Sequence, residues 1–404
     1  MKKFNFNIIL FVFFVVFIVA GIWGTCFTRL KWATIDMLAA IKHGNFSSVF
    51  DFKANVDEIS NKELSYHGLL METDSLKNNL LGTRVVLKDD TKVIKANTGS
   101  LIEEVRRIED TELEEVVSAI HKLQLVSEEN GAQFLYCAAP RKEYYEVAPS
   151  NAENSFKDNY DRFVRLLDKA SVPTLDFTEL FDEPNKKGED LFYYTDHHWK
   201  TTTGFFAAGA ISRELSSRYG FEYNENYLNP ENYTIEHFSD YFLGSKGKKV
   251  GTYFTWHGAD DFDLILPKFE TNMTESQPAK EELREGTFEE TVLYMQNMVK
   301  DYYGKNPYVT YSGGDFRLQI MSNKMNPEGK KVLLVRDSFA CVVAPFLSLQ
   351  TSELHICDVR DYAYYVGEKL NIEEYIREVK PDYVIVLYSG VSRIGGSNGK
   401  YDFF

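Results

Sequence analysis

The chain has 404 residues, of which 44% are hydrophobic and 26% charged, and these ordinary globular proportions exclude a disordered, collagenous or coiled-coil protein. Its 60 acidic and 45 basic residues give a formal net charge of -15 without any long basic run, so we do not expect a nucleic-acid partner. The 4 cysteines show neither CxxC nor CxxH spacing, which excludes a disulfide scaffold.

Residues 1–28 are predicted to form a membrane anchor. No charged residue occurs between Phe4 and Thr28, and the apolar run over residues 8–23 approaches the ~20 apolar residues that cross a bilayer. A buried core helix is one alternative, and a cleaved signal peptide is the stronger one, although no clear small-x-small cleavage site follows the run. Basic residues are nearly balanced on the two sides of the run, so the charge pattern leaves its orientation open.

Residues 29–100 mix polar residues with short apolar runs, and we expect a linker segment that contains strands. Residues 103–129 then carry apolar side chains at helical spacing and end at Asn130-Gly131, which predicts a helix with a glycine stop. The chain continues with an apolar run, a second helix pattern and a strand, over residues 133–139, 155–170 and 174–177. This alternation is typical of a parallel α/β sheet.

The segment from about 222 to 325 is richer in Asn, Tyr, Gly and acidic residues, and it contains a charged helix candidate near 280–300. We interpret it as an insertion in an α/β domain that spans residues 101–404. The α/β pattern resumes in three apolar strands, over residues 331–335, 353–357 and 382–388. The predicted fold is therefore a parallel sheet sandwiched by helices, with its site beyond the carboxyl ends of the strands.

One candidate nucleophile follows such a strand end. Ser338 comes directly after the strand in the string Val335-Arg336-Asp337-Ser338-Phe339. A serine at a tight strand-to-helix turn can project as a nucleophile, and backbone N–H groups at a helix N-terminus can hold an oxyanion. The competing interpretation is an N-cap that only satisfies backbone donors.

A candidate base lies in the string Thr195-Asp196-His197-His198-Trp199, before a predicted helix. A carboxylate two residues from an imidazole can accept its Nδ1–H and leave Nε2 free to take a proton from a serine. Capping with surface polarity is one alternative for these residues. A metal site is another, although no HExxH or other zinc spacing accompanies them.

The string TDHHW before a helix, with LLVRDSFACVVAPFL about 140 residues later, resembles the DHHW family. That family is similar to the alginate O-acetyltransferase proteins, whose catalytic domains are SGNH-hydrolase-like. The likeness covers roughly residues 130–395 and includes the less specific stretches 242–245 and 313–315. It implies an SGNH-hydrolase-like fold in which Asp-x-His precedes the serine, a permuted order that the alginate acetyltransferases share.

Carried over by motif, the resemblance implies that Ser338 is the nucleophile, His198 the general base and Asp196 the residue that orients it. His197 and Trp199 in the same string are candidate substrate-binding residues. No metal and no other cofactor are expected.

Arg360, in the string Asp358-Val359-Arg360, also matches the family pattern and is a further candidate substrate-binding residue. An ion pair with Asp358 is the commoner explanation for an arginine at a strand end. Ser389 and Gly390 stand where the fold's Asn oxyanion donor is expected, so that donor is not identified from the sequence.

The resemblance implies O-acetylation of a cell-surface or secreted polysaccharide through an acyl-enzyme, with acetyl groups relayed by a membrane-bound O-acyltransferase partner. Transfer to water by the same route would make the protein an extracellular carbohydrate esterase. A non-catalytic, glycan-binding scaffold of a polysaccharide export or acetylation complex is the third hypothesis. We expect a single-pass protein anchored in the lipid bilayer of the cell membrane, with its body on the extracytoplasmic side.

Overall fold

The computed structural model describes residues 34–35, 38, 67–88, 91–181, 188–255, 257–392 and 399–404. The chain divides into two compact units, residues 1–80 and 81–404, and the first contains α4 (His67–Leu80). The predicted membrane anchor over residues 1–28 lies outside the described residues. None of the helices within those ranges is both long and apolar enough to cross a bilayer.

The larger unit begins with a small antiparallel sheet. It pairs β1 (Val85–Lys88) with β2 (Thr91–Lys95), and β2 with β3 (Leu101–Glu103). Within the described part of residues 29–100, short apolar runs therefore form strands, and Ile94 of β2 is fully buried.

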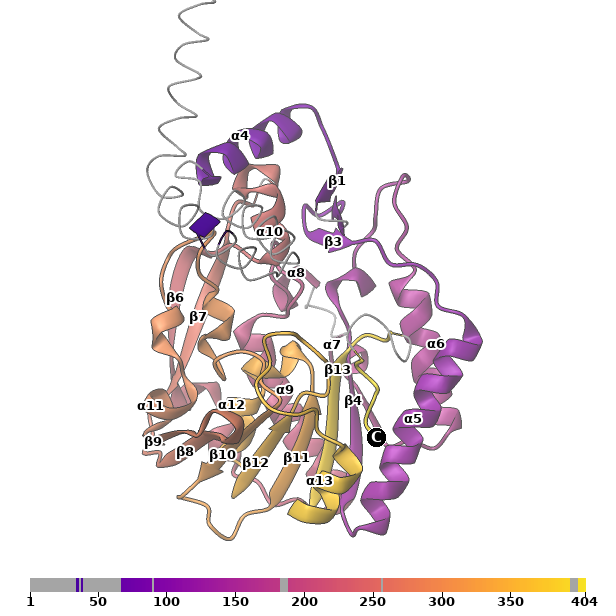
Figure 1. Cartoon of the computed structure of the whole chain (residues 1–404), viewed down its shortest axis with the longest axis vertical. Coiled ribbons are helices and arrows are strands. Elements are labelled where there is room, and N and C mark those ends of the chain that lie inside the picture. The colour runs from indigo at the N-terminus through magenta and orange to yellow at the C-terminus, as the bar shows by residue number, and fades with distance from the viewer. Residues whose placement is uncertain are drawn as a thin grey trace, which may run out of the picture. The chain divides into compact units, whose positions relative to one another are not determined.

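The main sheet has eight strands in the order β5-β4-β13-β11-β12-β10-β8-β9, and Figure 1 shows most of them side by side. The first five run parallel to their neighbours: β5 (Thr174–Asp176), β4 (Gln133–Ala139), β13 (Tyr383–Ser389), β11 (Lys331–Arg336) and β12 (Glu353–Cys357). The last three pair antiparallel: β10 (Leu318–Asn323), β8 (Met273–Gln277) and β9 (Glu282–Gly286).

The sheet is therefore mixed, and the prediction of a purely parallel sheet is wrong at this edge. The three antiparallel strands come from the region that the sequence marked as an insertion. Only the four residues 278–281 connect β8 to β9, and a connection this short joins antiparallel strands, whereas parallel strands need a longer crossover.

Helices cover both faces of the main sheet. On β11, Val332 and Leu334 belong to one hydrophobic core, and Leu333 and Val335 belong to the other. Parallel strands buried on both faces are apolar throughout, which explains the unbroken apolar runs in the sequence. One core takes in α7 (Phe177–Phe181), α9 (Thr201–Tyr219) and α12 (Ala344–Ser348), and the other takes in α5 (Asp110–Glu129), α6 (Phe156–Lys169) and α13 (Ile372–Val379).

Two predicted helices differ in extent. The helix expected over residues 103–129 starts only at Asp110, because Leu101–Glu103 pairs with β2 and Val105 bridges to Asn154. Gly131 beyond its end has a φ of 86°, in the left-handed region that glycine favours, as the glycine stop predicted.

The charged helix expected near 280–300 does not form. That stretch holds β9 and the short helix α11 (Phe288–Val292). Gly286 has a φ of 142°, which few residues other than glycine adopt, and Thr287 starts α11 with a capping box. A backbone turn and a new helix start therefore interrupt the pattern.

The remaining part of the inserted region forms a two-stranded antiparallel sheet of β6 (Tyr233–Phe242) and β7 (Asp260–Pro267). The connection between these strands contains α10 (Ser245–Val250). α8 (Gly188–Leu191) precedes the loop that leads into α9.

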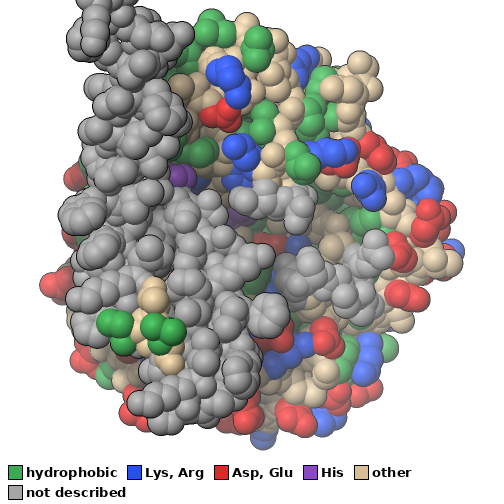
Figure 2. Space-filling view, turned by 45° about the horizontal axis from the view of Figure 1, so that its top comes forward, with side chains coloured by type: hydrophobic (Ala, Val, Ile, Leu, Met, Phe, Trp, Pro, Cys, Tyr) green, Lys and Arg blue, Asp and Glu red, His purple; other side chains and the backbone are tan. Residues whose placement is uncertain are grey.

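On the face seen in Figure 2, the described acidic and basic side chains are interspersed rather than gathered into single-sign patches.

Candidate active site

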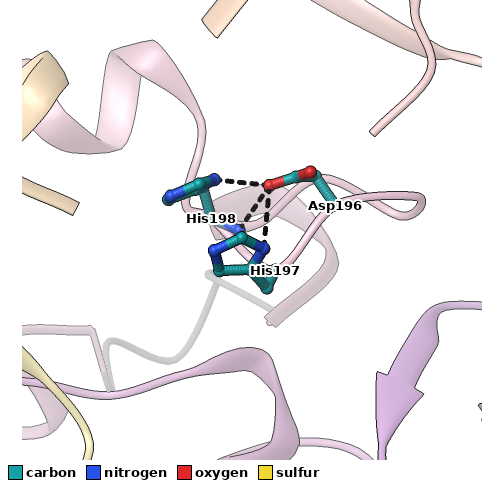
Figure 3. A group of neighbouring side chains, drawn as sticks. All are labelled: Asp196, His197 and His198. Carbon is teal, nitrogen blue, oxygen red and sulfur yellow. Dashed lines mark hydrogen bonds and ion pairs between the residues drawn. The ribbon is translucent and has the colours of Figure 1, made fainter. Parts of the chain in front are cut away.

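Asp196, His197 and His198 lie in the loop that leads into α9 (Figure 3). Asp196 Oδ1 accepts a hydrogen bond from the His198 backbone N–H at 3.0 Å and lies 2.5 Å from His198 Nδ1. This contact between residues two apart orients the ring locally, because an Asp side chain readily accepts from the backbone two residues on. His198 Nε2 is then the ring nitrogen left for a further partner.

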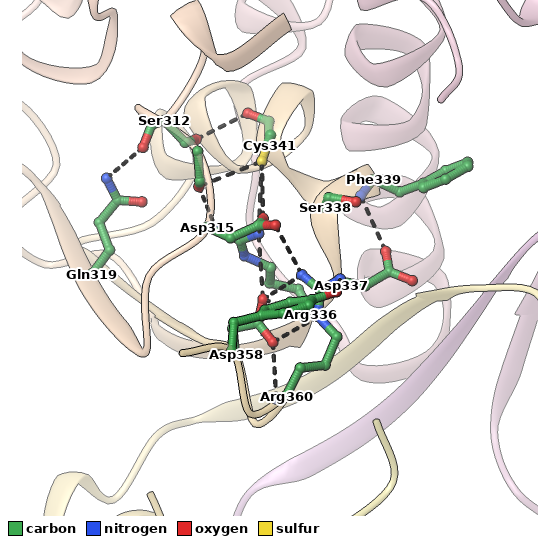
Figure 4. A network of polar contacts seen from close by, with 12 residues as sticks. Ser312, Asp315, Gln319, Arg336, Asp337, Ser338, Phe339, Cys341, Asp358 and Arg360 are labelled. Carbon is green, nitrogen blue, oxygen red and sulfur yellow. Dashed lines mark hydrogen bonds and ion pairs between the residues drawn. The ribbon is translucent and has the colours of Figure 1, made fainter. Parts of the chain in front are cut away.

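Ser338 lies where β11 leaves the sheet. The strand ends at Arg336, and a 3₁₀ turn spans Ser338–Val342. Asp337 caps this turn, since its Oδ1 accepts the Phe339 N–H at 3.0 Å (Figure 4). Asp337 therefore takes the capping role, and the Ser338 hydroxyl is available for another contact.

The structure brings Asp196, His198 and Ser338 into one hydrogen-bonded line. His198 Nε2 lies 2.7 Å from Ser338 Oγ, within the distance over which a base can take a proton. The His198 ring also stacks on Tyr308, with centroids 4.0 Å apart and an interplanar angle of 17°. The imidazole is thus fixed on one nitrogen by a carboxylate and on its face by an aromatic ring.

The Asp196 carboxylate is buried, with 3% of its surface exposed. Burial by itself would raise its pKa, but the His197 and His198 rings and the hydrogen bonds that it accepts hold the pKa well below its usual range. One of these bonds comes from the Ser245 N–H to Asp196 Oδ2 at 2.6 Å. An ionised carboxylate is the form that can accept His198 Nδ1–H.

Two residues that are distant in sequence support the histidine loop through hydrogen bonds to its backbone. Asp260 of β7 accepts the backbone N–H groups of Tyr194 and Thr195 at 2.6 and 2.8 Å. Lys142 Nζ donates to the carbonyl oxygens of Tyr193 and Tyr194 at 3.0 and 2.9 Å. Neither residue was predicted, because no local motif distinguishes them from the chain's other acids and lysines.

Ser338 lines a cavity of about 310 Å³. Its acidic, basic and imidazole lining side chains are Glu103, Arg141, His197, Asp337, Arg360 and Lys400. Arg141 pairs with Glu103 at 3.3 Å and Lys400 with Asp337 at 2.8 Å, so charges of both signs face the space in pairs. A polar and largely charge-paired lining suits a hydroxyl-rich ligand better than an apolar one.

Arg360 lies in the cavity wall with its guanidinium paired to carboxylates (Figure 4). Its Nε donates to Asp358 Oδ1 at 2.9 Å, and its Nη2 lies 2.5 Å from Asp358 Oδ2 and 3.1 Å from Asp315 Oδ2. Its Nη1 also donates to the Tyr362 hydroxyl at 3.1 Å. The ion-pair explanation is therefore realised in the structure, although the side chain still borders the space around Ser338.

The other two predicted binding residues take different positions. His197 lines the cavity, and its Nδ1 lies 3.1 Å from Ser245 Oγ. Trp199 is 0% exposed, and its Nε1–H donates to the Phe339 carbonyl at 2.9 Å. This burial excludes stacking of Trp199 on a ligand and makes it a link between the histidine loop and the serine turn.

The two residues at the expected Asn position are both engaged elsewhere. The Ser389 hydroxyl donates to Asp337 Oδ2 at 2.8 Å, and the Gly390 N–H donates to the Ala139 carbonyl at 2.8 Å. The Ser338 N–H opens the 3₁₀ turn, where backbone donors lack a partner within the turn. It is therefore the candidate oxyanion donor that the local structure offers.

Asp196, His197 and His198 could also supply ligands to a metal ion, since one atom from each lies within 4.8 Å of the others. Their present contacts favour hydrogen bonding: Asp196 Oδ1 lies 2.5 Å from His198 Nδ1 and 3.4 Å from His197 Nδ1. A metal ion there would have to replace these contacts.

Residues 100–239 match the family model described as SGNH hydrolase-like domain, acetyltransferase AlgX. The matched segment contains Asp196 and His198 and ends before Ser338. No curated protein matches the chain at a significant level.

Several solved structures share the fold. Bacillus cereus PatB1 is 17% identical, with 78% of this chain and 100% of that chain covered at a TM-score of 0.61. The structure of Bacillus cereus PatB1 with sulfonyl adduct is also 17% identical, with 79% and 99% covered at a TM-score of 0.60. A DHHW family protein from Eubacterium siraeum is 16% identical, with 76% and 92% covered at a TM-score of 0.55.

These likenesses confirm the resemblance that the TDHHW and RDSF strings predicted. The chain carries an SGNH-hydrolase-like α/β fold with a mixed sheet, similar to a DHHW family protein, and its residues 100–239 match the AlgX acetyltransferase family.

Proposed function

We propose that the protein is a serine-dependent O-acyltransferase that acetylates a cell-surface or secreted polysaccharide. The observation that carries the proposal is the hydrogen-bonded line from Asp196 through His198 to Ser338, with contacts of 2.5 and 2.7 Å. The match to a family described as an acetyltransferase supports acetyl as the transferred group.

In the first half of the proposed reaction, Ser338 Oγ attacks the acetyl carbonyl of the donor while His198 Nε2 takes the hydroxyl proton. Asp196 accepts His198 Nδ1–H and stabilises the imidazolium that forms. The Ser338 N–H donates to the carbonyl oxygen as negative charge develops on it. His198 then gives its proton to the leaving group, and an acetyl ester remains on Ser338.

In the second half, a sugar hydroxyl of the acceptor loses its proton to His198 Nε2 and attacks the ester carbonyl. The acetyl group leaves on the sugar, and the proton returns to Ser338 Oγ. A membrane-bound O-acyltransferase partner supplies the acetyl group in this proposal. The same two halves with water as the acceptor would make the protein an esterase, so the acceptor separates the two activities.

The test is turnover of p-nitrophenyl acetate by the full-length chain, with and without chitopentaose as acceptor. Release of p-nitrophenol and mass spectrometry of the sugar report the two halves separately. We expect Ser338→Ala to lower both by at least about 10³-fold, as removal of a nucleophile does in serine enzymes. Ser217→Ala, at an exposed serine on α9, is the matched control and should behave as wild type.

The outcomes separate the hypotheses. Acetylated sugar supports the transferase, whereas acetate released only into water supports the carbohydrate esterase. A Ser338→Ala variant that retains turnover contradicts the assigned nucleophile. A wild-type chain that turns over no ester with or without acceptor contradicts the enzyme and leaves the glycan-binding scaffold.

A further inference from the structure

A second cavity, of about 130 Å³, lies beside the acetyl-transfer site in the larger unit. The end of β8, the turn after it, the start of β10 and the loop after Arg360 build its wall. Its side chains combine polar, cationic and aromatic groups: Gln277, Lys280, Phe316, Arg317, Tyr364 and Tyr365. Most of these residues come from the inserted region, to which the reaction above assigns no binding role.

Two buried side chains in this wall carry polar atoms that have no hydrogen-bond partner among the described residues. Gln277 is 2% exposed, and its Nε2 donates to the Tyr294 hydroxyl at 2.6 Å while its Oε1 has no partner. The Arg317 side chain is 10% exposed, and its Nη2 pairs with Asp361 at 2.7 Å while Nε and Nη1 have no partner. These three atoms are themselves closed off from the cavity, so the polar groups that a ligand would meet are the accessible ones of the lining, such as the Lys280 ammonium and the Tyr364 hydroxyl.

Aromatic rings complete the lining. Tyr364 is 64% exposed, and Lys280 Nζ lies 4.3 Å from the ring centroid of Phe316. A sugar ring offers C–H faces that pack on aromatic rings, and its hydroxyls both donate and accept hydrogen bonds. The combination of accessible polar groups and an exposed ring therefore matches a sugar residue.

The second cavity adjoins the first through shared walls. Tyr362 lines the cavity around Ser338 and stacks on Tyr364 of the second cavity, with centroids 5.2 Å apart and an interplanar angle of 10°. Asp315 lines the second cavity and pairs at 3.1 Å with Arg360, which lines the first. A chain of linked sugars could therefore occupy both spaces at once.

We infer that this second cavity is a subsite for a neighbouring sugar residue of the acceptor polysaccharide. The inference rests on the proposed function and adds that the acceptor is an oligomer held on both sides of the Tyr362–Tyr364 stack. A single sugar would leave the second cavity unused and bind more weakly.

The test is binding of the full-length chain to an array of immobilised oligosaccharides and the corresponding monosaccharides. We expect wild type to retain oligosaccharides in preference to single sugars, and Tyr364→Ala to weaken that retention about tenfold, since a stacked ring contributes on that order. Tyr253→Ala, at a tyrosine that is 55% exposed and lies outside both cavities, is the matched control and should bind as wild type.

Equal oligosaccharide binding by wild type and Tyr364→Ala overturns the subsite, and so does an array on which wild type retains no oligosaccharide. Ser338→Ala keeps the two proposals apart, because it should lose p-nitrophenyl acetate turnover and still bind the same sugars. If wild type turned over the ester but Tyr364→Ala bound the array as wild type does, the subsite alone would be rejected. If wild type turned over no ester but lost oligosaccharide binding in Tyr364→Ala, the proposed enzymatic activity alone would be rejected.

Discussion

Lys142 is a buried lysine that supports the loop carrying Asp196 and His198. It is 2% exposed, and burial together with the nearby charge of Lys246 lowers its pKa from the ordinary value of 10.5 to about 7. Glu143, Asp260 and Asp196 oppose this shift without cancelling it. A lysine that donates only to backbone carbonyls thus carries its proton at a cost in the folded chain.

This depressed pKa predicts a pH-dependent stability. Between pH 7 and about 10 the unfolded chain binds more protons at Lys142 than the folded chain does. The contribution of Lys142 to the free energy of unfolding is therefore greatest above the unfolded pKa and falls as the pH drops towards 7. Lys142→Met should remove this pH dependence. The free energy of unfolding of wild type minus that of the variant should therefore grow as the pH rises.

Urea unfolding at several pH values across that window measures the difference. Lys169→Met, at an exposed lysine near the end of α6, is the control and should differ from wild type by a constant amount. If the difference in the free energy of unfolding between wild type and Lys142→Met stayed constant with pH, the depressed pKa of Lys142 would be contradicted.

At the scale of elements, α10 is one of the pieces of the inserted region that contact the proposed triad; the turn that carries Tyr308 is another. The Gly244 N–H donates to Thr195 Oγ1 at 2.7 Å, and the Ser245 N–H donates to Asp196 Oδ2 at 2.6 Å. The close approach needs glycine: a Cβ on Gly244 would lie 2.2 Å from Asp196 Cβ and 2.5 Å from its backbone N. The 242–245 stretch that the resemblance included therefore serves as a support for the carboxylate.

Gly244→Ala should push α10 away from Asp196, because the clash involves backbone atoms that cannot rotate aside. We expect a loss of about 1–3 kcal/mol in the free energy of unfolding, the usual cost of overpacking a filled site. We also expect a fall in ester turnover, since Asp196 loses a backbone donor. Chemical denaturation and p-nitrophenyl acetate turnover measure the two effects.

Gly209→Ala on α9 is the matched control, since its Cβ would meet the flexible end of Arg213 at 3.3 Å and Leu228 at 3.7 Å. It should retain turnover and near wild-type stability, helped by the better helix propensity of alanine. If Gly244→Ala had the same free energy of unfolding and the same ester turnover as Gly209→Ala, the role of α10 in positioning Asp196 would be contradicted.

At the scale of the whole molecule, the last residues of the chain are part of the core and of the site. Tyr401 and Phe403 are 1% and 0% exposed, and Tyr401 packs edge-on against Tyr388 of β13 at 5.3 Å. Lys400 Nζ lies 2.8 Å from Asp337 Oδ2, next to the proposed nucleophile. Burial by itself would raise the pKa of Asp337, but the nearby charges of Lys400 and Arg360 hold that pKa well below its usual range. These last residues thus help to cover the carboxyl ends of the central strands, where Ser338 lies.

Deletion of residues 400–404 should prevent stable folding. Loss of the buried Lys400–Asp337 pair costs about 3–5 kcal/mol, and loss of each buried aromatic ring costs a similar amount, against a typical total stability of about 5–15 kcal/mol. Circular dichroism and thermal unfolding measure the outcome. Asp402→Asn, which removes only an exposed contact to Lys369, is the control, and a deleted chain that unfolded near the control's temperature would contradict the expectation.

Local patterns in the sequence were sufficient for the central strands and for the contact between Asp196 and His198. β11, β12 and β13 are buried on both faces, so their apolar runs mark them directly. Asp196 and His198 are two residues apart, and a contact at that range depends on the loop alone. The family resemblance added the pairing with Ser338, which no local pattern contains.

Only the tertiary structure decided what surrounds those residues. Asp260, Lys142 and Ser245 reach the histidine loop from 49 to 66 positions away, and the sequence around each is ordinary. The antiparallel edge of the sheet and the second cavity arise in the same way, because strand pairing and cavity walls join segments whose local patterns do not specify their partners. The sequence by itself therefore determined the central strands and the residues that we propose to react, and long-range packing determined how these residues are held and which surfaces lie beside them.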